Sequence, residues 1–182
     1  MKKLNLNNHS TADWDFLVAS NWEPWDDWGL YALDYVSPPS CLVIGGFSYD
    51  TGLVLTKHPS AQNLKQGRIV TWYKNIDYNV ANARFVCGVT GPGQPFIAKL
   101  VYYGGPDWYK SRMTWWQTTN PHNEPATLVQ IHHFINDEWV FASESYEPPL
   151  SDPLNRCGIC SPRGYWWCSN AFDDTEIWVP VE

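Results

Sequence analysis

Short apolar runs separated by proline and glycine restrict this chain to an all-β fold. Its 182 residues include 14 Pro and 12 Gly, placed between the runs, and no stretch sustains the spacing of an amphipathic helix. Some runs alternate, as where Phe85, Cys87 and Val89 fall on one side of the chain and Arg84 and Val86 on the other. Turn signals recur about every ten residues, which is typical of a sandwich or barrel.

These runs predict about a dozen short strands. The connections between them show no crossover helices, so the strands should pair antiparallel in two packed sheets. The expected strands are 14–18, 29–33, 41–44, 52–55, 68–74, 83–89, 96–103, 112–117, 128–135, 139–143, 158–160, 165–168 and 175–179.

A chain of this length is expected to form one domain. Residues 12–182 are predicted to be that domain. Residues 1–11, which are rich in Asn and contain Lys2 and Lys3, are predicted to be a flexible arm. Hydrophobic residues make up 44% of the chain and charged residues 17%, which indicates a globular and not a disordered protein.

The charge pattern argues against nucleic acid as a partner. The net charge is −7, and only Lys2 and Lys3 are adjacent among the cations, so the sequence shows no basic stripe. No run approaches the roughly 20 apolar residues of a membrane helix, so membrane insertion is not expected. No apolar stretch follows Lys3 to form a classical signal peptide. If the protein works outside a cell, it is expected to leave by another route, such as lysis or packaging in a particle.

Five cysteines leave at least one thiol unpaired in a monomer. Cys41 and Cys87 lie within apolar runs, where a free thiol behaves as a small core residue. Cys157, Cys160 and Cys168 form the one cluster in the sequence. The three can be free thiols, can include a local disulfide, or can bind zinc together with a distant His. The sequence leaves these interpretations open.

The C-terminal third contains a set of motifs in a characteristic order: 112–116 (Arg-Met-Thr-Trp-Trp), Trp139, 155–159 (Asn-Arg-Cys-Gly-Ile) and 172–178 (Phe-Asp-Asp-Thr-Glu-Ile-Trp). In this order they resemble the closing half of a concanavalin A-like lectin/glucanase jelly roll. The resemblance is strongest to non-catalytic members associated with phages and other virions. It implies an antiparallel, two-sheet jelly-roll sandwich that binds glycan, cleaves glycan or joins surfaces together.

Glucanases of this fold place Glu-x-Asp-x-x-Glu or Glu-x-Asp-x-Glu on one strand, which brings the carboxylates to one face. Neither pattern occurs here. Glu144 and Glu147 have the wrong spacing, the segment 173–176 belongs to the closing strand, and 137–138 falls in a hairpin turn. The resemblance therefore predicts no glucanase activity, and the chain is expected not to be an enzyme.

A polysaccharide lyase on the same fold is the alternative. It would need Tyr, His, Arg and Gln on the concave face, and Gln130, His132, Arg84 and Tyr103 could supply them. The competing interpretation is that His132 and His133 lie on the two faces of one strand, with one of them in the core.

The resemblance also implies a structural calcium ion between the first and last strands. Asp173 and Asp174 match the closing-strand position, and Asp13 or Asp15 could approach from the first strand. Hard oxygen ligands suit Ca²⁺. Alternatively, Asp173 and Asp174 accept hydrogen bonds from local backbone N–H groups and shape the entry to the strand. No other cofactor is expected.

Three tryptophans spaced three residues apart are the main candidate binding group. Trp22, Trp25 and Trp28 could share one side of an extended left-handed segment, which has three residues per turn. Asp26 and Asp27 beside them would accept hydrogen bonds from sugar hydroxyls. The same rings could instead plug the end of the sandwich or form a subunit interface.

Two further aromatic groups stand out. Tyr103 and Trp108 flank a Gly-Pro-containing loop and join the candidate ligand-binding residues. Trp115 and Trp116 are adjacent on a strand, so one ring should enter the core and the other should remain outside it.

Together these observations predict a non-catalytic surface-binding or assembly module. Its partners would be glycan or neighbouring virion subunits, engaged through exposed aromatic rings, and it could form a homo-oligomer. The expected location is a virion or an extracellular surface, with the cytoplasm as the alternative.

Overall fold

The structure is a computed structural model of residues 1–182. It describes residues 1–4, 22–25, 28–31, 36, 41–44, 52–56, 59–61, 64–76, 83–89, 97–101, 107–150, 155–161 and 170–181. Apart from one turn of 3-10 helix, η2 (Pro59–Ala61), their regular structure is all strand. The strands are β1 (Lys2–Lys3), β2 (Trp22–Trp25), β3 (Trp28–Tyr31), β4 (Cys41–Ile44), β5 (Gly52–Thr56), β6 (Gln66–Asn75), β7 (Arg84–Val89), β8 (Ile97–Leu100), β9 (Tyr109–Thr119), β10 (Pro125–Ile135), β11 (Glu138–Glu147), β12 (Arg156–Ser161) and β13 (Asn170–Val179).

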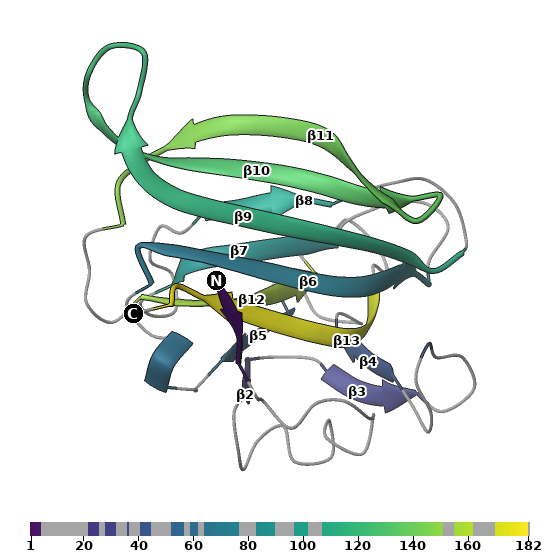
Figure 1. Ribbon diagram of the computed structural model, residues 1–182. Helices are drawn as coiled ribbons and strands as arrows, with labels where there is room; N and C mark the ends of the chain where they lie inside the picture. The colour runs from purple at the N-terminus through teal and green to yellow at the C-terminus, as the bar shows by residue number, and fades with distance from the viewer. Residues whose placement is uncertain are drawn as a thin grey trace.

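Two antiparallel sheets pack against each other (Figure 1), which confirms the predicted all-β sandwich. The larger sheet has the strand order β11-β10-β9-β6-β13-β4-β3, with β1 also paired to β13. The smaller sheet has the order β2-β5-β12-β7-β8 and lies behind the larger one in Figure 1. No described segment forms a helix long and apolar enough to cross a membrane.

Alternation of side chains along the strands builds the core between the sheets. From the larger sheet, Ile69, Met113 and Val129 point inward and are buried. From the smaller sheet, Phe85 and Ile159 meet them in the same apolar cluster. The intervening residues of β6, β9 and β10 must therefore lie on the outer face of the larger sheet, turned away from the smaller sheet.

A two-residue turn sets the pairing of β10 with β11. Asn136 and Asp137 both have positive φ angles, 49° and 64°, as a type I′ hairpin turn requires. The preceding hairpin, between β9 and β10, is closed by Asn120, whose side-chain oxygen accepts the backbone N–H groups of His122 and Glu124. Asn and Asp tolerate positive φ angles, such as those of Asn136 and Asp137, better than other non-glycine residues. Local sequence thus fixes the meander β9-β10-β11.

The close contact of Trp115 with Gly67 fixes β6 against β9. The two residues are directly opposite each other in the pairing, and the indole of Trp115 is fully buried. Its Nε1 donates a hydrogen bond to the Leu64 carbonyl oxygen at 3.0 Å. A Cβ atom on residue 67 would lie only 2.4 Å from the indole ring, so the site requires glycine.

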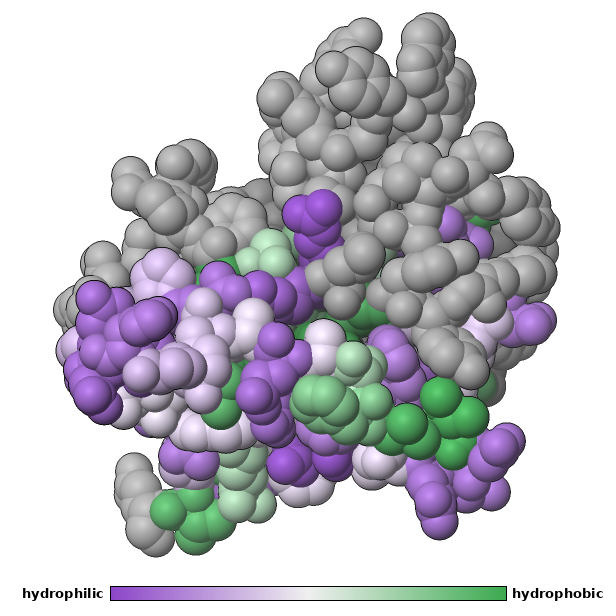
Figure 2. Space-filling view, turned by 90° about the horizontal axis from the view of Figure 1, so that it is seen from above, coloured by the Kyte–Doolittle hydropathy of each residue, from purple (hydrophilic) through white to green (hydrophobic). Residues whose placement is uncertain are grey.

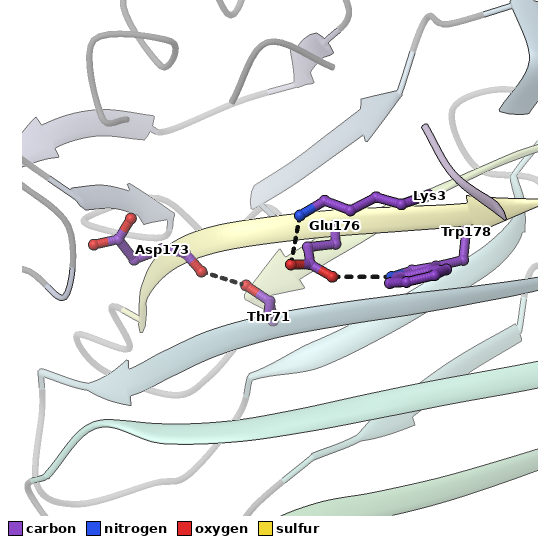
Figure 3. Close-up of polar contacts among 5 residues, drawn as sticks. All are labelled: Lys3, Thr71, Asp173, Glu176 and Trp178. Atoms are coloured by element: carbon purple, nitrogen blue, oxygen red, sulfur yellow. Dashed lines mark hydrogen bonds and ion pairs between the residues drawn. The ribbon is translucent and has the colours of Figure 1, made fainter. Parts of the chain in front are cut away.

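Strand β13 contains a bulge beside the Asp173 carboxylate. Its pairing with β6 shifts register between Asp173 and Glu176, and Asp174 has a φ of 45°. Inside the sandwich, the Thr71 hydroxyl donates to the Asp173 backbone oxygen at 3.0 Å (Figure 3). The same hydroxyl lies 2.7 Å from the Thr175 hydroxyl. These bonds satisfy polar groups that the irregular ladder leaves in the interior.

Residues 1–4 belong to the larger sheet and not to the flexible arm predicted for residues 1–11. Lys2 and Lys3 pair with β13, and the Leu4 backbone N–H donates to the Ile177 carbonyl oxygen at 2.8 Å. The Leu4 side chain is buried in the core, which accounts for the ordering of a segment whose composition is polar. Residues 5–11 lie outside the described part of the chain.

The predicted strands agree with the structure, except at the N-terminal side. Strand β4 has the predicted bounds, and most other predicted strands are extended by a few residues. Strand β2 was not among the predicted strands, because residues 22–28 were expected to form one extended left-handed segment. The structure places β2 at an edge of the smaller sheet, where the missing N–H of Pro24 is tolerated. The predicted strands 14–18 and 165–168 lie outside the described residues.

We expect the substitution Gly67→Ala to destabilise the protein. The new methyl group would collide with the Trp115 ring, and overpacking of this kind costs about 1–3 kcal/mol of unfolding free energy. Urea unfolding followed by tryptophan fluorescence would measure the change. Gln66 is the exposed neighbour of Gly67, so Gln66→Ala is the matched control. It should leave the unfolding free energy within about 0.5 kcal/mol of the wild-type value. Equal stability of the two variants would contradict the contact.

Candidate binding face

Aromatic and basic side chains meet on the outer face of the larger sheet. Strand register brings them together: Arg112 lies opposite His132, and Lys110 lies opposite Phe134 on one side and Trp72 on the other. We call this group the aromatic–cationic face. Its members are Arg68, Trp72, Lys110, Arg112, His132, Phe134, Trp139 and Phe141.

The cations on this face lie against rings. The Lys110 Nζ atom is 5.6 Å from the centroid of the Trp72 ring and 5.7 Å from that of Phe134. The Arg112 guanidinium lies 4.6 Å from the Trp139 ring centroid. Attraction between a cation and an aromatic face contributes about 0.5–1 kcal/mol at exposed sites. These contacts position the positive charges but do not neutralise them.

The edge of the face along β11 exposes apolar groups. A bulge in the β10–β11 pairing places Phe141 beside His132, and its ring meets the imidazole edge-on at 5.6 Å. Phe141 is 55% exposed, and Tyr146 on the same side of β11 is 44% exposed. Val140, which is also 44% exposed, lies on the opposite side of this edge strand. Figure 2, which looks down on the sandwich of Figure 1 from above, shows green apolar groups interleaved with purple polar ones on the described surface. Aromatic and apolar area is thus available to a partner.

Burial and mutual repulsion lower the pKa values of two groups on this face. The pKa of Arg112 is lowered by burial and then by Arg68, although a guanidinium stays charged in proteins. The pKa of His132 is lowered by burial and then by Arg112, Arg68 and His133. The Arg112 Nε and His132 Nδ1 atoms are covered and have no hydrogen-bond partner in the described structure.

The carboxylates that share this sheet face have other partners. Glu144 accepts a hydrogen bond from Gln130 Nε2 at 2.7 Å. Glu176 binds Lys3 Nζ at 2.7 Å and Trp178 Nε1 at 2.9 Å, as Figure 3 shows. No carboxylate of the described residues forms an ion pair with the cations of the aromatic–cationic face. The face is therefore locally positive on a protein whose net charge is −7.

His132 and His133 point to opposite faces of β10, as predicted. The His133 Nδ1 atom lies 2.7 Å from the Ser111 hydroxyl on the inner side, and burial lowers the pKa of His133. The predicted division of Trp115 and Trp116 is also confirmed, because the Trp115 ring is fully buried while Trp116 is half-buried.

The predicted lyase residues do not come together in the described structure. Gln130 and His132 share the outer face of the larger sheet. Arg84 belongs to β7 of the smaller sheet and faces the same way as Val86, away from the core residue Phe85. The two locations are on opposite sides of the sandwich. Tyr103 lies outside the described residues.

The acidic residues show no carboxylate pair of the glucanase type on β11. Glu144 faces outward, whereas Glu147 faces inward and forms an ion pair with Lys99 of β8. That ion pair links the two sheets at the edge of the sandwich.

The tryptophan segment differs from the single extended segment expected. The backbone of Trp22–Trp25 forms β2 of the smaller sheet, and that of Trp28–Tyr31 forms β3 of the larger sheet. Only the backbone of these strands is described, so the platform of Trp22, Trp25 and Trp28 stays a prediction. Asp26 and Asp27 lie outside the described residues. Trp108 is half-buried at the start of β9.

The Asp173 carboxylate is 1% exposed and accepts two backbone hydrogen bonds. Val36 N–H donates to Oδ2 and Asp174 N–H to Oδ1, both at 2.8 Å. These bonds correspond to the alternative interpretation, in which the carboxylate shapes the backbone. The described residues bring no group of three or more His, Cys, Asp or Glu together for a metal, and Asp15 lies outside them. The calcium site stays a prediction.

Cys157 and Cys160 are free, buried thiols on opposite sides of the smaller sheet. Cys157 belongs to the central core and Cys160 to a second apolar cluster with Leu55 and Val86. This separation rules out a disulfide or a shared zinc ion between the two. Burial raises the pKa of both thiols to about 12, which makes them unreactive. Cys168 lies outside the described residues.

Most of the aromatic–cationic face was not predicted from the sequence. The alternation of 110–116 with 128–134 could have shown that Lys110, Arg112, His132 and Phe134 share one face. It could not show that Trp72 and Trp139 flank them, because that depends on which strands are neighbours.

No protein-family model matches the chain, and no curated protein matches its sequence. Solved structures show a similar fold at low identity. A protein of unknown function from Shewanella oneidensis is 9% identical over 98% of this chain and 85% of that one, with a TM-score of 0.52. The binding domain of Paraclostridial mosquitocidal protein 1 is 7% identical, with a TM-score of 0.50, over 89% of this chain but 44% of that one. A functionally unknown Saccharomyces cerevisiae protein is 8% identical over 86% and 97%, with a TM-score of 0.47.

We expect the protein to become less stable as the pH falls below 6.5. Folding lowers the pKa values of His132 and His133 from that ordinary value, so the unfolded chain binds more protons there. The stability contributed by the neutral imidazoles is present above pH 6.5 and is lost below it. Urea midpoints at pH 7.5 and 5.5 would measure the loss. The double variant His132→Gln/His133→Gln should lose less stability between these two pH values than the wild type. An equal loss would show that the two histidines do not cause the pH dependence.

Proposed function

We propose that this protein is a non-catalytic binding module that recognises glycan through the aromatic–cationic face. The observation that supports the proposal most is the aromatic surface along β10 and β11, where the exposed Phe141 lies beside His132 and Trp139 lies against the Arg112 guanidinium. Flat aromatic faces can stack on the C–H groups of a sugar ring, while charged donors can bind its oxygens. A large exposed aromatic group beside polar groups is typical of a binding site.

The likeness to a toxin's binding domain is consistent with this proposal. It shows a shared fold, and a fold by itself hosts many functions. The separation of Glu144 from Glu147, and of Arg84 from His132, supports a non-catalytic module over the glycosidase or lyase alternative. The chemistry of the face, and not the likeness to other solved structures, supports glycan binding.

We expect Phe141→Ala to weaken glycan binding by at least about fivefold, because it removes the most exposed ring of the face. A glycan array would identify the ligand, and titration calorimetry would measure the affinity. Val140→Ala is the matched control: Val140 is adjacent on β11, is also exposed, and belongs to the opposite side of the strand. It should bind as the wild type does.

Three results would contradict or redirect the proposal. A blank array on folded protein would reject glycan as the ligand. Equal losses in Phe141→Ala and Val140→Ala would place the effect outside the face. Release of unsaturated sugar products would show that the protein is a lyase. Running the array with calcium and with a chelator would also test the predicted metal site at Asp173, Asp174 and Asp15.

A second candidate function is assembly with neighbouring subunits, as on a virus particle. The long edge strand β11 favours it, because its outer edge is unpaired in the described structure and exposes Val140, Phe141 and Tyr146. Open strand edges readily pair with another chain. On this proposal, the location is a virion or an extracellular surface, and the partner is a protein.

If β11 mediates self-association, the unfolding midpoint should rise with protein concentration, because association stabilises the folded state by mass action. Sedimentation velocity over the same concentrations would give the oligomeric state. Val140→Lys, which places a charge at this edge, should reduce association. A concentration-independent monomer would reject self-assembly through this edge.

A further inference from the structure

The aromatic–cationic face holds more positive charge than the neighbouring carboxylates of the described structure neutralise. Three of its members are cations, namely Arg68, Lys110 and Arg112, drawn from the adjacent strands β6 and β9. Arg68 donates from Nε to the Thr114 hydroxyl at 3.2 Å, which is a neutral partner. The protein as a whole has 19 acidic residues and 12 Lys and Arg, so this local excess runs against its overall charge.

The carboxylates that the described strands place on this sheet face have other partners, and Asp173, opposite Trp72, accepts backbone N–H groups. Glu176 lies opposite Val70, the residue that also lies opposite Arg112, yet both of its carboxylate oxygens are bound by Lys3 and Trp178. Glu144, from β11, is bound to Gln130. The described structure therefore leaves a place for a negative charge beside Arg112 that its own carboxylates do not fill.

The guanidinium of Arg112 is positioned for a ligand before the ligand arrives. It is half-buried, it stacks on Trp139, and its Nε atom has no hydrogen-bond partner in the described structure. A planar guanidinium held by an aromatic ring loses little further freedom on binding. Its fork of donors matches the two oxygens of a carboxylate. Burial and then repulsion from Arg68 lower the pKa of Arg112, and an anion at this place would offset that repulsion.

We infer that the aromatic–cationic face binds an acidic glycan, with the sugar carboxylate at Arg112 between Arg68 and His132. This inference rests on the proposed glycan-binding function and adds the chemical class of the glycan that is bound. Trp139 and Phe141 would lie against the sugar ring, and Lys110, between its two rings, would extend the positive surface toward a second acidic unit. A polymer of uronic acid units has this alternation of flat apolar faces and carboxylates.

The test compares a galacturonic-acid oligosaccharide with its methyl ester, which has the same ring but no charge. Wild-type protein should bind the acid more tightly than the ester. Arg112→Gln should weaken binding of the acid by about 10- to 100-fold, as for loss of a charge-assisted hydrogen bond, and should leave the ester unchanged. Lys65→Gln, which removes an exposed positive charge outside the face, should bind both as the wild type does.

Folding of each variant would be checked by near-ultraviolet circular dichroism and by its urea midpoint. If Arg112→Gln fails to fold, Arg68→Gln repeats the comparison from the neighbouring strand and should also bind the acid more weakly. Arg112→Lys keeps the charge without the planar fork, so it should bind the acid with intermediate affinity.

The outcomes separate this inference from the function on which it rests. Equal affinity for acid and ester, unchanged in Arg112→Gln, would overturn the acidic-glycan assignment and leave glycan binding intact. Tighter binding of a sulfated oligosaccharide than of the carboxylate one, also lost in Arg112→Gln, would keep an anion site and overturn its assignment to carboxylate. Failure of every glycan to bind folded protein would overturn the proposed function itself.

Discussion

The packing of Trp115 on Gly67 is the constraint on which the larger sheet depends. The indole fills the core directly over a residue without a side chain, and its N–H is bound to the Leu64 carbonyl oxygen. A slip of one residue between β6 and β9 would place a side chain under the ring and send Trp115 to the outer face. The same register places Arg112 and Lys110 outward, beside Trp72. Core packing on one side of the sheet thus sets the aromatic–cationic face on the other.

That surface stabilises its cations with rings and not with carboxylates. Cation–π contacts are weak, about 0.5–1 kcal/mol each when exposed, and they leave the charge available to a ligand. Carboxylate partners would have neutralised Arg112 and Lys110 and removed the attraction for an anion. The acids of this sheet face are instead bound by Lys3, Trp178 and Gln130. The arrangement is consistent with the proposed binding of an anion.

The sequence predicted local features well where neighbouring residues decide them. The hairpin turn, expected at 137–138 and found one residue earlier at Asn136–Asp137, follows from turn chemistry. The inward Trp115 with outward Trp116 and the two-sided His132–His133 pair follow from strand alternation. The sequence-based prediction failed where contacts with residues far apart in the chain decide the local structure. Lys2 and Lys3 form a strand because β13 offers an edge and the core accepts Leu4, and β2 tolerates Pro24 because it lies at a sheet edge.

The chain's own sequence therefore determined an all-β sandwich, the hairpin β10–β11, and which face of each strand is apolar, because these depend on residues close along the chain. Only the tertiary structure decided which strands are neighbours. Trp139 reaches Arg112 from β11 across an intervening strand, and Lys110 lies between rings from β6 and β10. Contacts between strands far apart in sequence are set by the packing of the whole core, so the aromatic–cationic face exists only once that core has formed.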